Sequence, residues 1–348
     1  MRCIVRIPLI CGFLILISLG ACDNNAPEEL IEFPPAPGIN YVETYGQLHV
    51  AGGKLRNESG NVVQLKGMST YWLNWEPGMK YANADVVRTL AREWNASVLR
   101  IAMGVNPGDG SGYIMLGNRN ELKRMVDVLA RACIDNGIYF IIDWHSYNSL
   151  HLADEEAAFF TEIANEYGGY PNILYELYNE PGQFESWSES LKPYQEHLIQ
   201  DVIRPIDADN IIIIGSRQWD QSLDECADDP ITGNNLMYGF HFYAAGHNGD
   251  IGREMRGRVD YAIQKGLAVF ATEWGPVHWD WTLNKIDTAE ADVYIDWMDA
   301  NNIGWTNWSI CDLEEAASAL KPGALSTGEW TSRDLTPSGK FIRWKLLE

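Results

Sequence analysis

The chain has 348 residues, of which 46% are hydrophobic and 21% charged, which excludes disordered, collagen-like and multi-span membrane proteins. Acidic residues outnumber basic ones by 48 to 26, and the resulting net charge of −22 disfavours nucleic acid, anionic lipid and polyanionic substrates as partners. The 14 Trp, 16 Tyr and 10 Phe exceed the evident needs of one core, so we expect some rings to stack against a ligand.

Residues 1–21 have the order of a secretory signal peptide. Arg2 and Arg6 precede an apolar run, Ile7 to Leu19, that is too short to span a bilayer as a helix. Small residues and Cys22 close the run and resemble the lipobox of bacterial lipoproteins. That resemblance implies lipidation of Cys22, contact with a membrane only through this lipid, and an exported envelope protein at the outer membrane or cell surface. A plain signal peptide that happens to contain a cysteine is the alternative.

Removal of residues 1–21, which carry two bases and no acid, changes the net charge from −22 to −24. Residues 22–40 are expected to form an acidic, proline-rich tether that holds the folded part away from the membrane. Residues 41–348 are assigned to a single catalytic domain. Cys133, Cys226 and Cys311 lie in this domain, where they allow at most one disulfide and lack the spacing of a zinc site.

Within the domain, short apolar runs alternate with longer segments of helical period. The eight apolar runs are 62–68, 97–103, 138–144, 173–178, 211–215, 236–242, 267–274 and 303–308. The helical segments include 84–95, 119–136, 155–167, 186–203, 252–265 and 289–301. This alternation predicts an α/β fold with a parallel sheet, and eight strands predict a closed (βα)8 TIM barrel. An open doubly wound sheet is the alternative, but no Gly-x-Gly-x-x-Gly follows the first strand.

Two further features concern the ends of the predicted strands. Before the first strand, residues 47–60 contain two glycine-bearing turns between short alternating runs, which predicts a small N-terminal β-hairpin closing the barrel floor.

At the opposite face, four strands end in polar residues: 143–145, 178–181, 241–243 and 272–275. Barrel enzymes carry their chemistry at the C-terminal ends of the strands, so this convergence is the main functional signal.

Two glutamates facing one another on an aromatic-walled rim fit glycoside hydrolysis better than other reactions. One glutamate must stay protonated to donate a proton, and the other must be ionised to attack. A neighbouring carboxylate raises the pKa of the first, and a neighbouring Arg lowers the pKa of the second. Metal-assisted hydrolysis is a weaker hypothesis. Its ligands would be Asp143, His145, His151 and Asp154, which lack a recurring ligand spacing.

From about Tyr45 to the C-terminus, the chain resembles glycoside hydrolase family 5, in the branch of bacterial endo-β-1,4-glucanases. The resemblance depends on seven motifs in order: QLKGMS (64–69), LRIAM (99–103), IDWH (142–145), YNEP (178–181), HFY (241–243), ATEWG (271–275) and WTNWS (305–309). It implies Glu180 as general acid/base and Glu273 as nucleophile of a retaining reaction. The two carboxyl groups should then lie about 5 to 5.5 Å apart, and no cofactor or metal is needed.

The resemblance also implies substrate-binding roles. Arg100 and Tyr243 would keep Glu273 ionised, and Asn179 would hold the sugar 2-hydroxyl. His145 and His241 would bind hydroxyls or orient the carboxylates. The aromatic residues expected to stack on sugars are Trp308 under the reacting sugar and Trp75 and Trp219 at flanking subsites. Core packing is the alternative role for Trp75 and Trp219, and it stays open for Trp219.

Two positions depart from the family pattern. Many relatives have a His near Tyr71 and a Lys where Leu313 stands, while the acid of the second motif, Glu315, is present. Both positions belong to the glycone side of the cleft. We therefore expect the reaction to be retained, while affinity or chain preference on that side differs.

The predicted function is a retaining endo-β-1,4-glucanase that acts on internal bonds of soluble or amorphous β-glucan polysaccharides or oligosaccharides. A β-mannanase, xyloglucanase or mixed-linkage glucanase is the alternative, because one hydroxyl contact shifts preference by about 10- to 100-fold. A non-catalytic glycan-binding lipoprotein is an alternative of another class, against which the presence of both Glu180 and Glu273 argues. We expect a monomer without a separate carbohydrate-binding module, since the barrel motifs run almost to Glu348.

Overall fold

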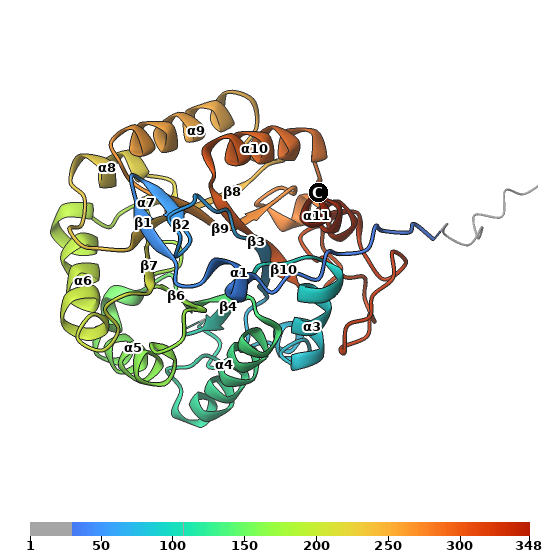
Figure 1. The fold of residues 1–348 in the computed structure, drawn as a ribbon, viewed down its shortest axis with the longest axis horizontal. Coiled ribbons are helices and arrows are strands. Elements are labelled where there is room, and N and C mark those ends of the chain that lie inside the picture. The colour runs from blue at the N-terminus through green and yellow to red at the C-terminus, as the bar shows by residue number, and fades with distance from the viewer. Residues whose placement is uncertain (1–29, 107) are drawn as a thin grey trace, which may run out of the picture.

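The computed structural model describes residues 30–106 and 108–348, and its centre is a closed barrel of eight parallel strands (Figure 1). The strands are β3 (Lys66–Thr70), β4 (Val98–Gly104), β5 (Tyr139–His145), β6 (Ile173–Glu176), β7 (Ile211–Ile214), β8 (Leu236–Tyr243), β9 (Val269–Gly275) and β10 (Gly304–Ile310). Each pairs with the next in sequence, and β10 closes the ring by pairing in parallel with both β9 and β3. The predicted TIM barrel is therefore confirmed.

The strands are buried on both faces, which explains their continuous apolar sequences. All four residues of β7 are isoleucines and all are buried. Residues of β5 pair in register with β4 on one side and β6 on the other, so that Asp143 lies opposite Ala102 and Glu176. The inner surface of the barrel faces its own packed interior and the outer surface faces helices, so neither surface needs polar residues until the strands end.

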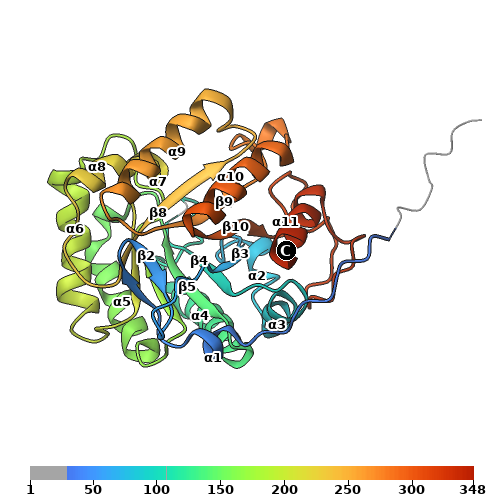
Figure 2. The ribbon, with the colours of Figure 1, turned by 45° about the horizontal axis from the view of Figure 1, so that its top comes forward.

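Helices form an outer ring around the strands, as Figures 1 and 2 show from two directions. The longer helices are α3 (Ala84–Glu93), α4 (Leu116–Asn136), α5 (Ala153–Tyr167), α6 (Lys192–His197) with its flanking turns η2 (Trp187–Leu191) and η3 (Leu198–Ile203), α9 (Gly249–Gln264), α10 (Thr288–Asn301) and α11 (Pro337–Leu347). The short ones are α1 (Tyr41–Tyr45), α2 (Glu76–Met79), η1 (Ser149–His151), α7 (Arg217–Asp220), α8 (Leu223–Asp228) and η4 (Trp281–Leu283). No helix among the residues described is long and apolar enough to cross a membrane.

A two-stranded antiparallel hairpin, β1 (His49–Ala51) and β2 (Lys54–Arg56), lies at the N-terminal end of the barrel. The Val50 N–H donates to the Asn235 side chain, which directly precedes β8, and the Lys54 ammonium donates to the Asn301 carbonyl, shortly before β10. These contacts place the hairpin over the barrel floor, as predicted, and leave the opposite face open.

The segment expected to be a tether is partly folded onto the barrel. The Ile31 N–H donates to the Ser332 hydroxyl, and the Phe33 ring packs against Trp344 of α11 with centroids 5.3 Å apart. Figures 1 and 2 show this segment running past α11 to α1. Phe33 and Ile39 thus pack on the folded domain, whereas most residues of 31–40 are exposed, and the assignment of residues 22–40 as a tether stays a prediction. The predicted signal peptide and Cys22 lie outside the described residues.

Cys133, Cys226 and Cys311 are all buried and free. Burial raises the pKa of each thiol, so all three stay protonated at neutral pH. None of these three cysteines forms a disulfide with another, so the fold depends on its packed core.

Candidate active site

The polar residues predicted at the strand ends converge at the C-terminal face of the barrel. Arg100 lies in β4, His145 ends β5, His241 and Tyr243 lie in β8, and Glu273 lies in β9. Asn179 and Glu180 follow β6 in the short segment before Pro181. The parallel order of the strands brings these residues, far apart in sequence, into one cluster.

Arg100 is the centre of this cluster and is fully buried. Its guanidinium donates to Glu273 Oε2 at 2.9 Å, to Glu176 Oε2 at 2.7 Å and to Asn179 Oδ1 at 2.8 Å. It also lies 2.9 Å from Asp143 Oδ2. Burial alone would lower the pKa of Arg100, but the charges of Asp143, Glu176 and Glu273 outweigh burial and raise it well above its ordinary value. The guanidinium therefore carries a permanent positive charge next to Glu176 and Glu273.

Glu273 is surrounded by groups that favour its ionised form. The Tyr243 hydroxyl donates to Glu273 Oε1 at 2.5 Å, and Arg100 donates to the other oxygen. Burial alone would raise the pKa of Glu273, but the charges of His241 and Arg100 and the hydrogen bond from Tyr243 hold it below its ordinary value. Glu273 is thus a carboxylate at neutral pH.

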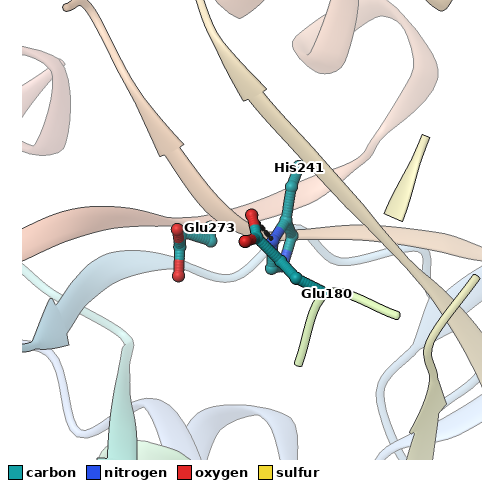
Figure 3. A group of neighbouring side chains, drawn as sticks. All are labelled: Glu180, His241 and Glu273. Atoms are coloured by element: carbon teal, nitrogen blue, oxygen red, sulfur yellow. Dashed lines mark hydrogen bonds and ion pairs between the residues drawn. The ribbon is translucent and has the colours of Figure 1, made fainter. Parts of the chain in front are cut away.

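Glu180 has the opposite protonation behaviour. Burial, followed by the negative charge of Glu273, raises the pKa of Glu180 above its ordinary value, despite a hydrogen bond with His241. The imidazole Nδ1 of His241 lies 3.1 Å from Glu180 Oε1, and its Nε2 lies 2.9 Å from the Thr272 hydroxyl. Figure 3 shows Glu180 reaching toward His241, with Glu273 beside it. The surroundings therefore favour the protonated form of one carboxyl group and the ionised form of the other.

The separation of these groups bears on the chemistry they can perform. One oxygen of Glu180, one of Glu273 and one ring nitrogen of His241 all lie within 4.8 Å of one another. Retaining glycosidases place their two carboxyl groups about 5 to 5.5 Å apart, whereas inverting enzymes leave about 6.5 to 9.5 Å for a water molecule. The close approach seen here fits direct attack by one carboxylate.

The same three residues are a possible set of metal ligands, but both ring nitrogens of His241 already have hydrogen-bond partners. The four ligands of the alternative metal hypothesis do not come together as a ligand group among the described residues. Asp143 and His145 are buried beside each other, while His151 and Asp154 are exposed on η1 and α5. The arrangement supports acid–base and nucleophilic chemistry by carboxyl groups.

Buried polar atoms of the site that have no hydrogen-bond partner among the described residues include Nδ2 of Asn179 and Nε2 of His145. The other polar atom of each side chain has a partner. Oδ1 of Asn179 accepts a hydrogen bond from Arg100, and Nδ1 of His145 lies 2.6 Å from Asp143 Oδ2. Burial and the nearby Arg100 charge lower the pKa of His145 to about 3, so its imidazole stays neutral. Buried polar atoms are rarely unpaired, and these two are available to hydroxyl groups of a ligand.

Aromatic rings gather beside His145. The Trp308 ring stacks on His145 at 5.2 Å with an 8° angle, and Tyr71 lies 5.5 Å from Trp308. Trp75 packs beside Trp72 at 4.9 Å and is only half-buried, so it is not a core residue. Trp219 is 44% exposed and follows β7, which lies diametrically across the barrel from β3. Core packing is thereby excluded for Trp219 as well.

Comparison with known proteins decides the family. The family model described as cellulase (glycosyl hydrolase family 5) matches residues 56–314. The chain belongs to glycosyl hydrolase family 5. An endoglucanase of Clostridium saccharobutylicum is 41% identical over 304 residues, which are 86% of this chain and 64% of that protein. Endoglucanase A of Evansella cellulosilytica is 43% identical, over 83% of this chain and 57% of that protein. The chain thus spans about three fifths of the length of these curated relatives.

Solved structures of family 5 enzymes cover the barrel almost completely. A structure from Cytophaga hutchinsonii has a TM-score of 0.83 and 41% identity, and the match covers 88% of this chain and 96% of that one. The catalytic domain of Thermobifida fusca endoglucanase Cel5A, solved as a variant in complex with cellotetraose, has a TM-score of 0.78 and 33% identity, with 88% and 99% covered. The family 5 fold therefore extends over the whole barrel.

Tyr71, one of the two positions that depart from the family 5 pattern, lies near the acid Glu315. Tyr71 and Glu315 are close enough that, after burial, the charge of Glu315 is the next cause that raises the pKa of the Tyr71 phenol. Burial also raises the pKa of Glu315. Leu313 accepts a backbone hydrogen bond from Glu315 and brings no charge to this corner. A phenol at position 71 and a half-buried acid at position 315 thus lie near each other, and the leucine at position 313 adds no positive charge beside them.

Four residues in or beside the site were not singled out from the sequence: Glu176, Asp220, Tyr147 and Trp281. Glu176 ends β6 and pairs with Arg100 through two hydrogen bonds, and a glutamate closing an apolar strand was a signal that could have revealed it. The Trp281 ring meets Tyr243 edge-on at 4.9 Å. Its loop has no strand-end pattern, so the sequence did not locate it at the cleft.

Proposed function

We propose that this protein is a retaining endo-β-1,4-glucanase in which Glu273 is the nucleophile and Glu180 the general acid/base. The observation that carries the proposal is the pair itself: two glutamates with oxygens within 4.8 Å, one with a lowered and one with a raised pKa. Family 5 membership and the endoglucanase names of relatives 41 and 43% identical support it. The cellotetraose bound by the Thermobifida fusca enzyme supports a β-1,4-glucan as substrate.

In the first step, a carboxylate oxygen of Glu273 attacks the anomeric carbon of the reacting sugar. The bond from that carbon to the glycosidic oxygen breaks, and Glu180 gives its proton to the departing oxygen, so that the rest of the chain leaves as an alcohol. The product is a glycosyl ester of Glu273. Arg100 and Tyr243 favour this step because they keep Glu273 ionised until it attacks.

In the second step, Glu180 is ionised and takes a proton from a water molecule. The resulting hydroxide attacks the anomeric carbon, the ester bond to Glu273 breaks, and both glutamates return to their initial states. Once Glu273 is esterified, its negative charge no longer raises the pKa of Glu180, which favours the switch from acid to base. His241 hydrogen bonds Glu180 and holds it on the correct side of the sugar.

The remaining site residues bind the sugar chain in this proposal. The unpartnered Nδ2 of Asn179 donates to the 2-hydroxyl of the reacting sugar, and Nε2 of His145 contacts another hydroxyl. Trp308 forms the floor beneath that sugar, and Trp75 and Trp219 stack on sugars to either side of it. Because Trp75 and Trp219 follow strands on opposite sides of the barrel, a bound chain crosses the full width of the cleft, which suits attack at internal bonds. Glu315 contacts a hydroxyl on the glycone side.

A comparison of substrates tests this function. The wild type should release reducing ends from carboxymethylcellulose faster than from glucomannan and xyloglucan, with a rapid fall in viscosity. The Glu273→Ala variant should lose at least about 10³-fold in kcat on each substrate, since the nucleophile is removed. Glu166→Ala, which changes an exposed residue on α5, is the control and should match the wild type.

The outcomes separate the alternatives. Faster turnover of glucomannan or xyloglucan would replace the glucanase assignment by a mannanase or xyloglucanase with the same mechanism. Binding of all three polymers without turnover by the wild type would contradict the enzyme proposal and leave a glycan-binding protein.

We also propose that Cys22 carries a lipid that anchors the protein to a bacterial envelope membrane, at the outer membrane or cell surface. The apolar run that ends in two small residues and a cysteine supports this location. The Cys22→Ala variant should move from the membrane fraction to the soluble fraction of lysed cells, while its specific activity is unchanged. A variant that still sediments with membranes would show that Cys22 is not the anchor.

A further inference from the structure

The segment that follows β7 has a backbone conformation that residues other than glycine rarely adopt. Gln218, Trp219 and Asp220 have φ angles of 56°, 57° and 59°, so three consecutive residues with side chains lie in the left-handed region. Single residues adopt this region sparingly, and three in a row need support from their surroundings. Such segments persist where neighbouring contacts hold them, and they gather at functional sites.

Asp220 supplies much of that support, and its side chain is completely buried. One carboxylate oxygen, Oδ1, accepts the N–H of Ser216. The other, Oδ2, accepts the N–H of Glu180 at 3.1 Å and lies 3.7 Å from His241 Nε2. The first contact is local to the turn, but the second joins residues 40 positions apart in sequence.

Glu180 also has a left-handed backbone, with a φ of 53°. Its N–H is held by Asp220, and the carbonyl of the next residue, Pro181, accepts the N–H of Trp219 at 2.9 Å. The segment after β7 therefore holds the backbone of Glu180 from both sides. This backbone places the carboxyl group of Glu180 next to His241, with Glu273 nearby (Figure 3). A rotation about its φ would carry the carboxyl group away from both residues.

We propose that Asp220 is a positioning residue for proton transfer by Glu180: it fixes the strained backbone of Glu180 and thereby aims the carboxyl group at the glycosidic oxygen. This inference depends on the role of Glu180 in the proposed function. Asp220 is fully buried and accepts the backbone N–H of Glu180, so it acts through the backbone of that residue. Its loss therefore weakens proton donation and leaves the attack by Glu273 intact.

Substrates with different leaving groups test the inference in the purified protein. Cellotetraose needs a proton on its leaving oxygen, whereas 2,4-dinitrophenyl β-cellobioside releases a stable phenolate without one. Asp220→Asn keeps the size of the side chain but replaces one acceptor oxygen by a donor NH2 group. We expect kcat/KM for cellotetraose to fall by about 10- to 100-fold and kcat/KM for the dinitrophenyl substrate to stay within about threefold of the wild type.

Two variants measured in parallel make the result specific. Glu180→Ala should show the same dependence on the leaving group, with a larger loss on cellotetraose. Asp207→Asn changes another buried aspartate that accepts two backbone N–H groups, from Asp209 and Asn210, at the other end of the barrel before β7. This control should lower the melting temperature without any dependence on the leaving group.

Equal losses on both substrates in Asp220→Asn, or no loss, would overturn the inference while leaving the role of Glu180 intact. Absence of leaving-group dependence in Glu180→Ala would instead contradict the proposed function.

If Asp220→Asn does not fold, Asp220→Glu carries the same prediction, because it keeps the charge but displaces the carboxylate from the Glu180 N–H. Azide attacks the glycosyl ester of Glu273 without base catalysis, so it should raise kcat for the dinitrophenyl substrate in variants whose second step is slowed by a misplaced or missing Glu180. The same rise in Asp207→Asn would contradict the assignment.

Discussion

Glu180 and Glu273 are chemically identical side chains only a few ångströms apart, and their surroundings make them different. Tyr243 and Arg100 each donate a hydrogen bond to Glu273, while Glu180 has His241 and faces the charge of its neighbour. Activity in the first step needs Glu273 ionised and Glu180 protonated. Since the pKa of Glu273 is lowered and that of Glu180 is raised, the pH range in which both conditions hold is widened.

The acidic limb of the pH profile therefore reports Glu273, and Tyr243→Phe tests this assignment. Loss of the hydroxyl removes a hydrogen bond to the ionised form, so the pKa of Glu273 should rise and the acidic limb of kcat/KM should move to higher pH by about one unit. The basic limb, set by Glu180, should stay in place. The measurement is kcat/KM for a soluble cello-oligosaccharide across the pH range.

Tyr139→Phe is the matched control for that experiment. The Tyr139 hydroxyl is also hydrogen-bonded, to the Gly46 carbonyl at 2.7 Å, but at the barrel floor. Its removal should lower stability and leave both limbs unchanged. A profile of Tyr243→Phe that superimposes on that of Tyr139→Phe would contradict the role given to Tyr243.

At the scale of elements, the strands were predictable because parallel strands of a barrel are buried on both faces and read as continuous apolar runs. All eight were located to within a few residues, and β7 matches its predicted run almost completely. Helix α11 and the packing of residues 31–40 were not predicted. Each depends on contact with the other, as between Phe33 and Trp344, and a contact across more than 300 residues leaves no periodic pattern.

The site was predictable to the extent that it occupies strand ends. His145, His241 and Glu273 were located for that reason, while Arg100 was assigned from the resemblance to family 5, and the structure brings these residues together as expected. The pairing of Arg100 with Glu176 depends on barrel register, which the sequence does not specify. Asp220 was missed because its role arises from a left-handed backbone and one long-range hydrogen bond, neither of which has a residue-type signature.

At the scale of the whole molecule, the closed barrel explains how residues from distant parts of the sequence come to surround one glutamate pair. Strands β3 and β7 lie opposite each other, so Trp75 and Trp219 stand on the two sides of the glutamate pair. The chain as a whole carries a net charge of −22, yet Arg100 and His241 place positive charge beneath the reacting groups. A neutral sugar chain is compatible with both the acidic surface and this local balance.

The central claim is that Glu273 forms a covalent bond with the reacting sugar. A 2-deoxy-2-fluoro-β-cellobioside with a dinitrophenyl leaving group tests it most directly, because the fluorine slows both steps while the activated leaving group speeds the first, so that the glycosyl ester accumulates. Mass spectrometry of the treated protein should show one added fluorocellobiosyl unit, and peptide mapping should place it on Glu273. An adduct on another residue, or an unmodified protein that releases products of inverted anomeric configuration from cello-oligosaccharides, would contradict the account.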